Sequence, residues 1–183
     1  CNGAGKTTAS YTILPEILDC KEFVNADEIA RGLAPFQPER AGIQAGRLML
    51  TRIKSLLESG ENFAFETTLS TKSYVNFLKV AKDKGYQITL LFFWLNSVDL
   101  AISRVKTRVK EGGHNIPENV IRRRYEGGLA NFFELYITIV DNWMLINNSG
   151  EPYEIVAEGS TDGIEIANNE LWENLKNEYY GKQ

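Results

Sequence analysis

A phosphate-binding loop is predicted at the start of the chain. The residues Asn2-Gly3-Ala4-Gly5-Lys6-Thr7-Thr8 match the second half of the pattern G-x-x-x-x-G-K-[ST], and a helix-forming segment follows directly. In such a loop, backbone N–H groups and a helix N-terminus surround phosphates. Lys6 would place a positive charge at the β- and γ-phosphates, and the Thr7 hydroxyl would ligate Mg²⁺. The alternative is a chance glycine-rich turn.

Two carboxylates that follow short extended segments are candidates for the proton acceptor. Asp27 comes two residues after Phe23-Val24-Asn25, and Glu66 directly follows Phe63-Ala64-Phe65. Strand carboxyl ends are where open α/β sheets bind ligands. Phosphorylation of a hydroxyl needs a carboxylate that orients the O–H and accepts its proton, and Asp27 is our first choice.

Each carboxylate also has other interpretations. Asp27 could simply cap a helix over residues 28–32, because aspartate is favoured at that position. Glu66 could be a solvated carboxylate at a strand end, a ligand of a substrate hydroxyl, or a support for Mg²⁺.

Arginines lie on both sides of a glycine-containing break between two helices. Arg108 precedes the segment 111–117, and Arg122, Arg123 and Arg124 follow it. Charge that develops on a transferred phosphoryl group needs such cations. Three consecutive helical residues cover a wide arc, so at least one of the three should face the nucleotide. The alternative is solvated helix charges, and His114 is expected to be an exposed loop histidine.

Hydrophobic spacing predicts alternating strands and helices. Ala45, Met49, Ile53 and Leu56 recur at helical spacing and should form one buried face. The alternation predicts a single α/β domain over residues 1–183, doubly wound around a parallel sheet flanked by helices, with a helical-hairpin lid at about 104–125. The expected strands are 22–25, 62–65, 86–95, 144–147 and 153–157, and the expected helices are 38–59, 72–84, 98–109, 118–136 and 166–180.

The composition excludes several classes of protein. A length of 183 residues suits one domain. The formal net charge of −4 argues against a broad nucleic-acid surface. The longest apolar run, 90–95, is far below the ~20 residues that cross a bilayer, and no signal-peptide layout opens the chain. Two cysteines favour free thiols in a reducing cytoplasm. A strand should precede the phosphate loop, so we expect the natural chain to begin earlier.

Four motifs, taken in order, resemble the zeta toxin family of P-loop kinases. The resemblance extends from Cys1 to about Ser149, and the three motifs after the phosphate loop make it specific. The motifs are 2–8 (NGAGKTT), 23–30 (FVNADEIA), 65–70 (FETTLS), and 104–109 (RVKTRV) with 112–117 (GGHNIP).

The resemblance implies an ATP-dependent kinase that uses Mg²⁺ and transfers phosphate to an alcohol group. Better-studied relatives phosphorylate the sugar of UDP-N-acetylglucosamine, and family members often pair with an antitoxin protein. The implied roles are ATP binding by Asn2, Gly3, Ala4, Gly5, Lys6, Thr7 and Thr8, Mg²⁺ binding by Thr7, base catalysis by Asp27, substrate binding by Glu66 and Thr67, and phosphate stabilisation by Arg108 with one or more of Arg122, Arg123 and Arg124.

Two other functions fit the same residues. One is a different small-molecule kinase on this scaffold, such as an antibiotic or metabolite phosphotransferase. The other is a non-catalytic regulatory module in which the loop senses ATP and the arginine hairpin serves a partner. The variant Asp27→Asn separates the last from an enzyme, because only an enzyme would lose phosphoryl transfer while still binding ATP.

Overall fold

The computed structural model describes residues 1–16, 20–113 and 115–181, with the side chain of Glu16 excepted. The chain forms two compact units. Unit 1 contains residues 1–4, 68–105 and 117–183, and unit 2 contains residues 5–67 and 106–116. The phosphate loop runs from one unit into the other, between Ala4 and Gly5. The expectation of one domain stays a prediction.

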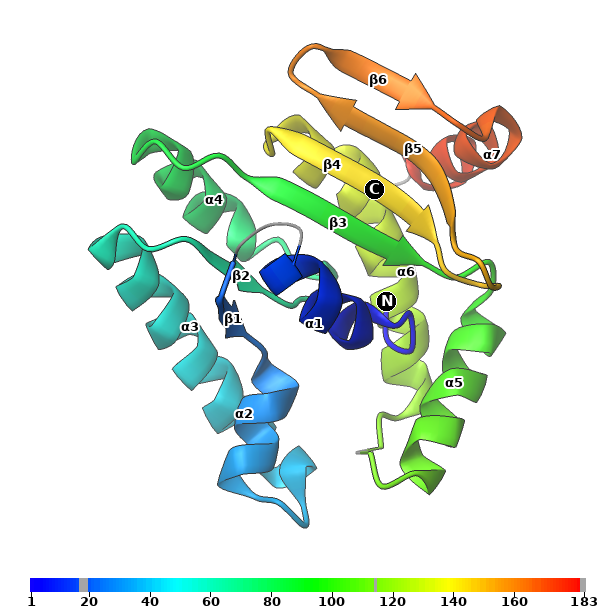
Figure 1. Cartoon of the computed structure of the whole chain (residues 1–183). Coiled ribbons are helices and arrows are strands. Elements are labelled where there is room, and N and C mark those ends of the chain that lie inside the picture. The colour runs from blue at the N-terminus through cyan, green and yellow to red at the C-terminus, as the bar shows by residue number, and fades with distance from the viewer. Residues whose placement is uncertain (17–19, 114, 182–183) are drawn as a thin grey trace. The chain divides into compact units, whose positions relative to one another are not determined.

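Each unit has its own sheet (Figure 1). In unit 2, β1 (Glu22–Val24) pairs in parallel with β2 (Phe63–Phe65). In unit 1, the strand order is β3-β4-β5-β6, and β3 (Thr89–Trp94) runs parallel to β4 (Asn142–Asn147). The last two strands, β5 (Glu154–Ser160) and β6 (Gly163–Ile166), are antiparallel. The predicted α/β class is confirmed, with an antiparallel hairpin added at one edge.

Most helices lie close to their expected positions. In unit 2, helix α1 follows the loop, and α3 follows α2 through the 3₁₀ turn η1. Helix α5 begins in unit 1, and its last turn belongs to unit 2. No helix in the described part of the chain is long and apolar enough to cross a membrane. The bounds are α1 Lys6–Glu16, α2 Ala26–Leu33, η1 Pro38–Ala41, α3 Gly42–Ser59, α4 Tyr74–Asp83, α5 Val98–Lys110, α6 Glu118–Glu134, η2 Tyr136–Thr138 and α7 Asn169–Tyr179.

The expectation of a closing helix over 166–180 was wrong at its start. Residues 163–166 form strand β6, and the helix begins only at Asn169 after an Asn168 cap. The Asn168 side chain accepts a hydrogen bond from the Leu171 N–H at 3.1 Å. Asparagine at this position satisfies one of the free N–H groups of a first helical turn. The cap therefore separates the strand from the helix, although Ile166 fits the apolar spacing of both.

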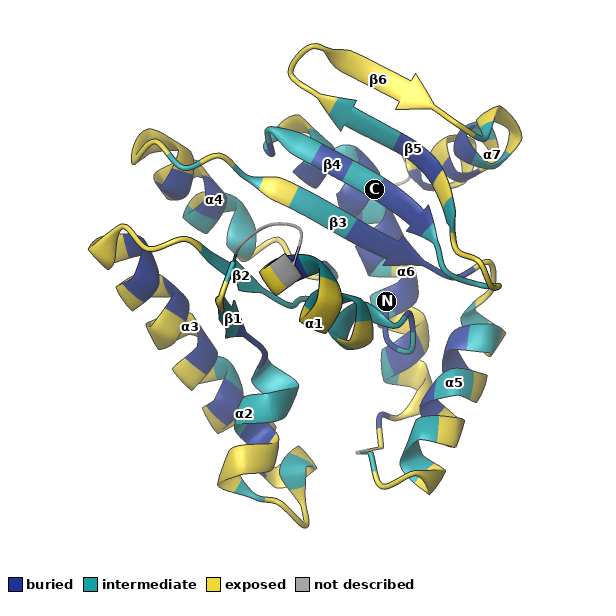
Figure 2. Cartoon of the chain, in the orientation of Figure 1, coloured by how far each residue is buried: buried dark blue, intermediate teal, exposed yellow. Residues whose placement is uncertain are grey.

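The core of unit 1 is a cluster of aromatic rings. Phe132 on α6 stacks on Phe92 of β3, with ring centroids 4.8 Å apart, and meets Trp143 of β4 edge-on at 5.5 Å. Trp143 in turn stacks on Trp172 of α7 at 5.5 Å. These contacts place α6 and α7 on one face of the sheet, where Figure 2 shows buried residues on α6, β3 and β4.

The core of unit 2 lies along helix α3. The predicted stripe is confirmed, since Ala45, Met49, Ile53 and Leu56 are all buried. Ala45 packs in one cluster with Ala30 of α2. Small side chains at this contact let the two helices approach closely. Helix α3 also lies against β1 and β2, and so supports the two strands whose ends carry the candidate carboxylates.

Candidate active site

The first half of the phosphate loop is held by unit 1. Asn2 is 6% exposed and Ala4 is fully buried. The Asn148 amide Nδ2 donates to the Ala4 carbonyl at 2.9 Å, and Arg124 Nη1 donates to Asn2 Oδ1 at 3.4 Å. Hydrogen bonds from the residue after β4 and from α6 therefore hold the first half of the loop in place.

Gly3 could not be replaced without moving helix α5. Its φ is +75°, a conformation that side chains disfavour. A Cβ atom at this position would lie 2.9 Å from the Ala101 carbonyl and 3.2 Å from Arg104 Cβ. The first turns of α5 thus press directly on the loop, and glycine is needed for both its φ and its size.

The second half of the loop meets a single carboxylate in unit 2. Thr7 Oγ1 donates to Glu66 Oε2 at 2.6 Å, and Lys6 Nζ lies 3.2 Å from Glu66 Oε1. Asn25 Nδ2 donates to the same Glu66 Oε2 at 2.9 Å and reaches Thr7 Oγ1 at 3.5 Å. Glu66 and the three residues bonded to it are called the Glu66 cluster below.

Strand register explains why these residues meet. Strands β1 and β2 are parallel with Val24 opposite Phe65, so the next residues, Asn25 and Glu66, leave the same edge of the sheet together. The Glu66 N–H donates to the Val24 carbonyl at 3.0 Å and prolongs the pairing by one residue. The Glu66 side chain is only 15% exposed, so its two oxygens are held by the loop rather than by bulk water.

The side-chain oxygens of Thr7 and Glu66 are suitable ligands for a hard divalent cation. Mg²⁺ prefers oxygen ligands and is usually bound by one or two protein groups together with water and substrate phosphates. The Thr7 hydroxyl and the Glu66 carboxylate supply such oxygens 2.6 Å apart. Groups of three or more His, Cys, Asp or Glu side chains able to hold a metal ion do not occur among the described residues. The Thr7 hydroxyl and the Glu66 carboxylate are oxygen ligands of the kind that Mg²⁺ takes when water and phosphate oxygens complete its coordination.

Asp27 does not cap helix α2, so that alternative was wrong. The helix begins at Ala26, and its cap is Asn25, whose Oδ1 accepts the Asp27 N–H at 2.8 Å. Asp27 lies in the first turn with a half-buried side chain. Asn25 thus uses its oxygen to fix the turn that carries Asp27 and its nitrogen to bind Glu66.

The three consecutive arginines of α6 have different surroundings. Arg122 pairs with Asp99 at 2.8 Å on the exposed surface, and Arg123 is exposed. Arg124 is half-buried and touches Asn2 of the loop. Arg124 is therefore the member of the run that the structure brings to the loop.

Other predicted site residues are half-buried or exposed in their own elements. Arg108 is half-buried in the last turn of α5, and its carbonyl accepts the Gly113 N–H at 2.8 Å, which closes the turn. Thr67 is half-buried directly after Glu66, and Thr8 is exposed in the first turn of α1. His114 lies outside the described residues.

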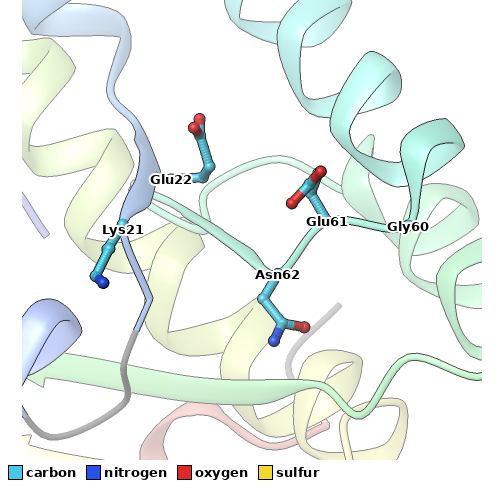
Figure 3. Close-up of a pocket in the computed structure, with 5 residues that line it drawn as sticks. All are labelled: Lys21, Glu22, Gly60, Glu61 and Asn62. Atoms are coloured by element: carbon cyan, nitrogen blue, oxygen red, sulfur yellow. The ribbon is translucent and has the colours of Figure 1, made fainter.

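A surface hollow elsewhere in unit 2 contains none of the predicted site residues. It is lined by Lys21, Glu22, Gly60, Glu61 and Asn62 (Figure 3). Glu22 pairs with Arg52 at 2.7 Å. The hollow lies at the amino ends of β1 and β2, opposite to the ends where Asn25 and Glu66 emerge, so it does not belong to the Glu66 cluster.

Three residues of these sites escaped the sequence analysis. Asn25 could have been found, because asparagine before a helix is a common cap. Asn148 could not, because it reaches a loop residue 144 positions away. Arg104 lies in the motif 104–109, but its hydrogen bonds go to the backbone carbonyls of Asn148 and Ser149, and every residue has a carbonyl.

A glycine-lysine-threonine loop before a helix, with parallel strands and covering helices, defines the P-loop kinase type of α/β fold. Solved structures share this fold. A chain of the crystal structure of AvrRxo1-ORF1:-ORF2 with ATP has a TM-score of 0.75 at 18% identity, and the match covers 95% of this chain and 60% of that one. The structure of the PezAT chromosomal toxin-antitoxin system of Streptococcus pneumoniae gives a TM-score of 0.66 at 17% identity over 100% of this chain and 76% of that one.

Sequence comparison then gives the family. The sequence model of the zeta toxin family matches residues 1–152. A protein of uncharacterised function from Haemophilus influenzae is 32% identical over 124 residues, which are 68% of this chain and 86% of the relative. The chain belongs to the zeta toxin family.

Proposed function

We propose that this chain is an ATP-dependent phosphotransferase that phosphorylates a hydroxyl of a small substrate, with a UDP-activated amino sugar as the acceptor. The observation that carries the proposal is the Glu66 cluster, in which one carboxylate meets both Lys6 and Thr7 of the loop. This pairing keeps the cationic and hydroxyl groups that a nucleotide needs in position before the nucleotide arrives.

Nucleotide binding is assigned to the loop from Asn2 to Thr8. Lys6 would turn its ammonium from Glu66 to the β- and γ-phosphates of ATP. A Mg²⁺ ion held by the Thr7 hydroxyl and the phosphates, with Glu66 beside it, would neutralise part of the phosphate charge. Structural neighbours support this assignment, since one of them was crystallised with ATP.

Proton transfer is assigned to Asp27. Its role would be to orient the acceptor hydroxyl and accept its proton as the hydroxyl oxygen forms a bond to the γ-phosphorus and the bond to the ADP oxygen breaks. Asn25 supports this role because it fixes the helical turn that carries Asp27. Glu66 and Thr67 would contribute to acceptor binding.

Stabilisation of the negative charge on the transferred phosphoryl group is assigned to Arg108 and Arg124. A guanidinium offers several N–H donors in a fixed plane, which suits a phosphoryl group with charge on three oxygens. Arg124 is preferred over Arg122 because Arg122 is occupied by Asp99 on the surface. An antitoxin partner is proposed because a structural neighbour comes from a toxin-antitoxin system.

The test is phosphoryl transfer from γ-labelled ATP to a panel of UDP-sugars and free sugars. We expect label on a UDP-amino sugar, loss of transfer in Asp27→Asn with ATP still bound, and normal transfer in the control Asp83→Asn, which changes an exposed aspartate at the end of α4. Transfer to another acceptor would replace the substrate and keep the kinase. ATP binding without any transfer would favour the regulatory module.

A further inference from the structure

The segment after β4 makes a polar contact with the phosphate loop that no residue of the proposed mechanism requires. Asn148 Nδ2 donates to the Ala4 carbonyl at 2.9 Å. Ala4 is fully buried, so water does not compete for this carbonyl. Both residues belong to unit 1, and the contact therefore lies within one compact body.

Holding this carbonyl has a geometric consequence for the next residue. A peptide group is planar, and in the trans form its C=O and the following N–H point in opposite directions. The Ala4 carbonyl and the Gly5 N–H belong to one such group. When Asn148 draws the carbonyl toward β4, the Gly5 N–H is turned the other way. Backbone N–H groups of this kind are the groups with which a phosphate loop binds its ligand.

Two further hydrogen bonds fix the backbone of Asn148 at the ends of β3 and β4, and a third fixes that of Ser149. Arg104 Nη1 donates to the Asn148 carbonyl at 2.8 Å, and Arg104 Nη2 donates to the Ser149 carbonyl at 3.0 Å. The Asn148 N–H donates to the Trp94 carbonyl at 2.9 Å. A guanidinium that grips two successive carbonyls restricts both position and rotation of the segment between them.

The same arginine also lies next to the loop at Gly3. A Cβ at Gly3 would meet Arg104 Cβ at 3.2 Å, so the stem of Arg104 lies against Gly3 while its head holds Asn148. Arg104 thus holds the backbone of residues 148–149 by hydrogen bonds, and the Asn148 amide holds the Ala4 carbonyl by another. The Ala4 carbonyl and the Gly5 N–H belong to one rigid peptide group.

We propose that Asn148 is a positioning residue that sets the orientation of the phosphate loop, and that Arg104 acts through it. The proposal rests on the proposed nucleotide site, and it adds that the site's affinity for phosphate depends on a side chain that never touches phosphate.

The test compares two probes, ATP and inorganic tripolyphosphate, by isothermal titration calorimetry in the presence of Mg²⁺. Tripolyphosphate has the phosphates but no base or ribose. In Asn148→Ala we expect both probes to bind roughly tenfold more weakly, the effect of about one hydrogen bond. Asn148→Asp, which has the same shape without the N–H donor, should weaken both at least as much. Arg104→Lys should show a smaller loss of the same kind.

The matched control is Asn168→Ala. Asn168, like Asn148, makes side-chain hydrogen bonds within unit 1: it donates to Glu154 Oε1 at 2.6 Å and accepts from the Leu171 N–H at 3.1 Å. Its loss should lower the melting temperature about as much as the loss of Asn148 does. Affinity for both probes should stay at the wild-type value in this control, because a merely structural loss does not reorient the loop.

Three results would overturn the proposal, and they differ from one another. Unchanged affinity in Asn148→Ala, while wild type binds both probes, removes the positioning role and leaves the proposed function intact. Weaker binding of ATP with unchanged binding of tripolyphosphate means that Asn148 contacts the nucleoside instead. A wild-type protein that binds neither probe removes the nucleotide site and this proposal with it.

Discussion

The aromatic core of unit 1 is buried and the Glu66 cluster of unit 2 is partly buried, and different forces hold them. The rings of Phe92, Phe132, Trp143 and Trp172 make contacts with centroids 4.8–5.5 Å apart, and the gain comes from apolar area removed from water. The Glu66 cluster depends on directional bonds to one carboxylate at 2.6–3.2 Å.

The two regions should therefore control different properties of the protein. Apolar packing is strong and non-directional, so the aromatic core should set the free energy of unfolding. A partly buried carboxylate with charged and polar partners contributes little net stability, because desolvation offsets the attraction. The Glu66 cluster should therefore set activity, and variants of the two regions should separate stability from turnover.

The largest effect is expected for Phe132→Ala. Phe132 is fully buried and touches Phe92, Phe133 and Trp143, so its removal leaves a cavity and should lower the free energy of unfolding by about 3–5 kcal/mol. Denaturant titration measures this change in the free energy of unfolding. The control Phe36→Ala changes a ring that is 98% exposed and should leave the midpoint unchanged. A loss below ~1 kcal/mol at Phe132 would contradict the assigned core.

For Glu66→Gln we expect the opposite pattern, a loss of turnover without a loss of stability. The variant keeps the size of the side chain but removes the charge that pairs with Lys6, so phosphoryl transfer should fall on the order of 100-fold while the unfolding midpoint changes little. Steady-state kinetics and denaturant titration are run in parallel, with the exposed Glu61→Gln as the control. If stability falls and turnover does not, the comparison between the two regions fails.

A smaller effect on turnover is expected in α6. Arg124→Ala should lower the rate of transfer about tenfold, because Arg124 is the arginine of its run that reaches the loop, and charge stabilisation counts most in the transition state. Arg123→Ala, at the exposed neighbour, is the matched control and should behave as wild type. Equal losses in the two variants would mean a general effect of positive charge.

The smallest effect concerns Asp141, at the amino end of β4. Asp141 accepts the Ile88 N–H at 2.7 Å and pairs with Lys82 at 2.9 Å, and both bonds lower the pKa of its carboxyl below the ordinary 3.8. The charged form is therefore favoured in the folded state, and its contribution is present above pH 3.8 and lost as the pH falls through the lowered pKa.

The variant Asp141→Asn should accordingly lose about 1 kcal/mol of unfolding free energy near neutral pH. The difference from wild type should shrink below pH 3.8, where the wild-type carboxylate becomes protonated. Thermal unfolding measured from pH 7 down to pH 3 checks this. A difference that grows on acidification would mean that the sign of the pKa shift is wrong.

Sequence alone predicted the features that depend on local patterns. The stripe Ala45–Leu56 and the loop-helix junction at Lys6 are fixed by periodicity and by a short motif, and both were found. Strand β6 was missed because four residues with two isoleucines fit either a strand or a helix, and the Asn168 cap decides between them.

The site was less predictable because its contacts join distant segments. Asp27 and Glu66 could be proposed from their positions after strands, but the bonds from Glu66 to Lys6 and Thr7 depend on the register of β1 and β2. The choice among Arg122, Arg123 and Arg124 depends on the rotation of α6, which three adjacent arginines leave open. Asn148 carried no local signal at all.

Phosphoryl transfer can be followed directly by ³¹P NMR of the γ-phosphate of ATP after wild-type protein, Mg²⁺ and UDP-N-acetylglucosamine are mixed. We expect the γ-phosphate signal to decay while the signals of ADP and of a new phosphomonoester appear together, in equal amounts. If ATP is bound by the protein but its γ-phosphate remains intact with this and other acceptors, the chain is not a phosphotransferase, and the Glu66 cluster serves nucleotide binding alone.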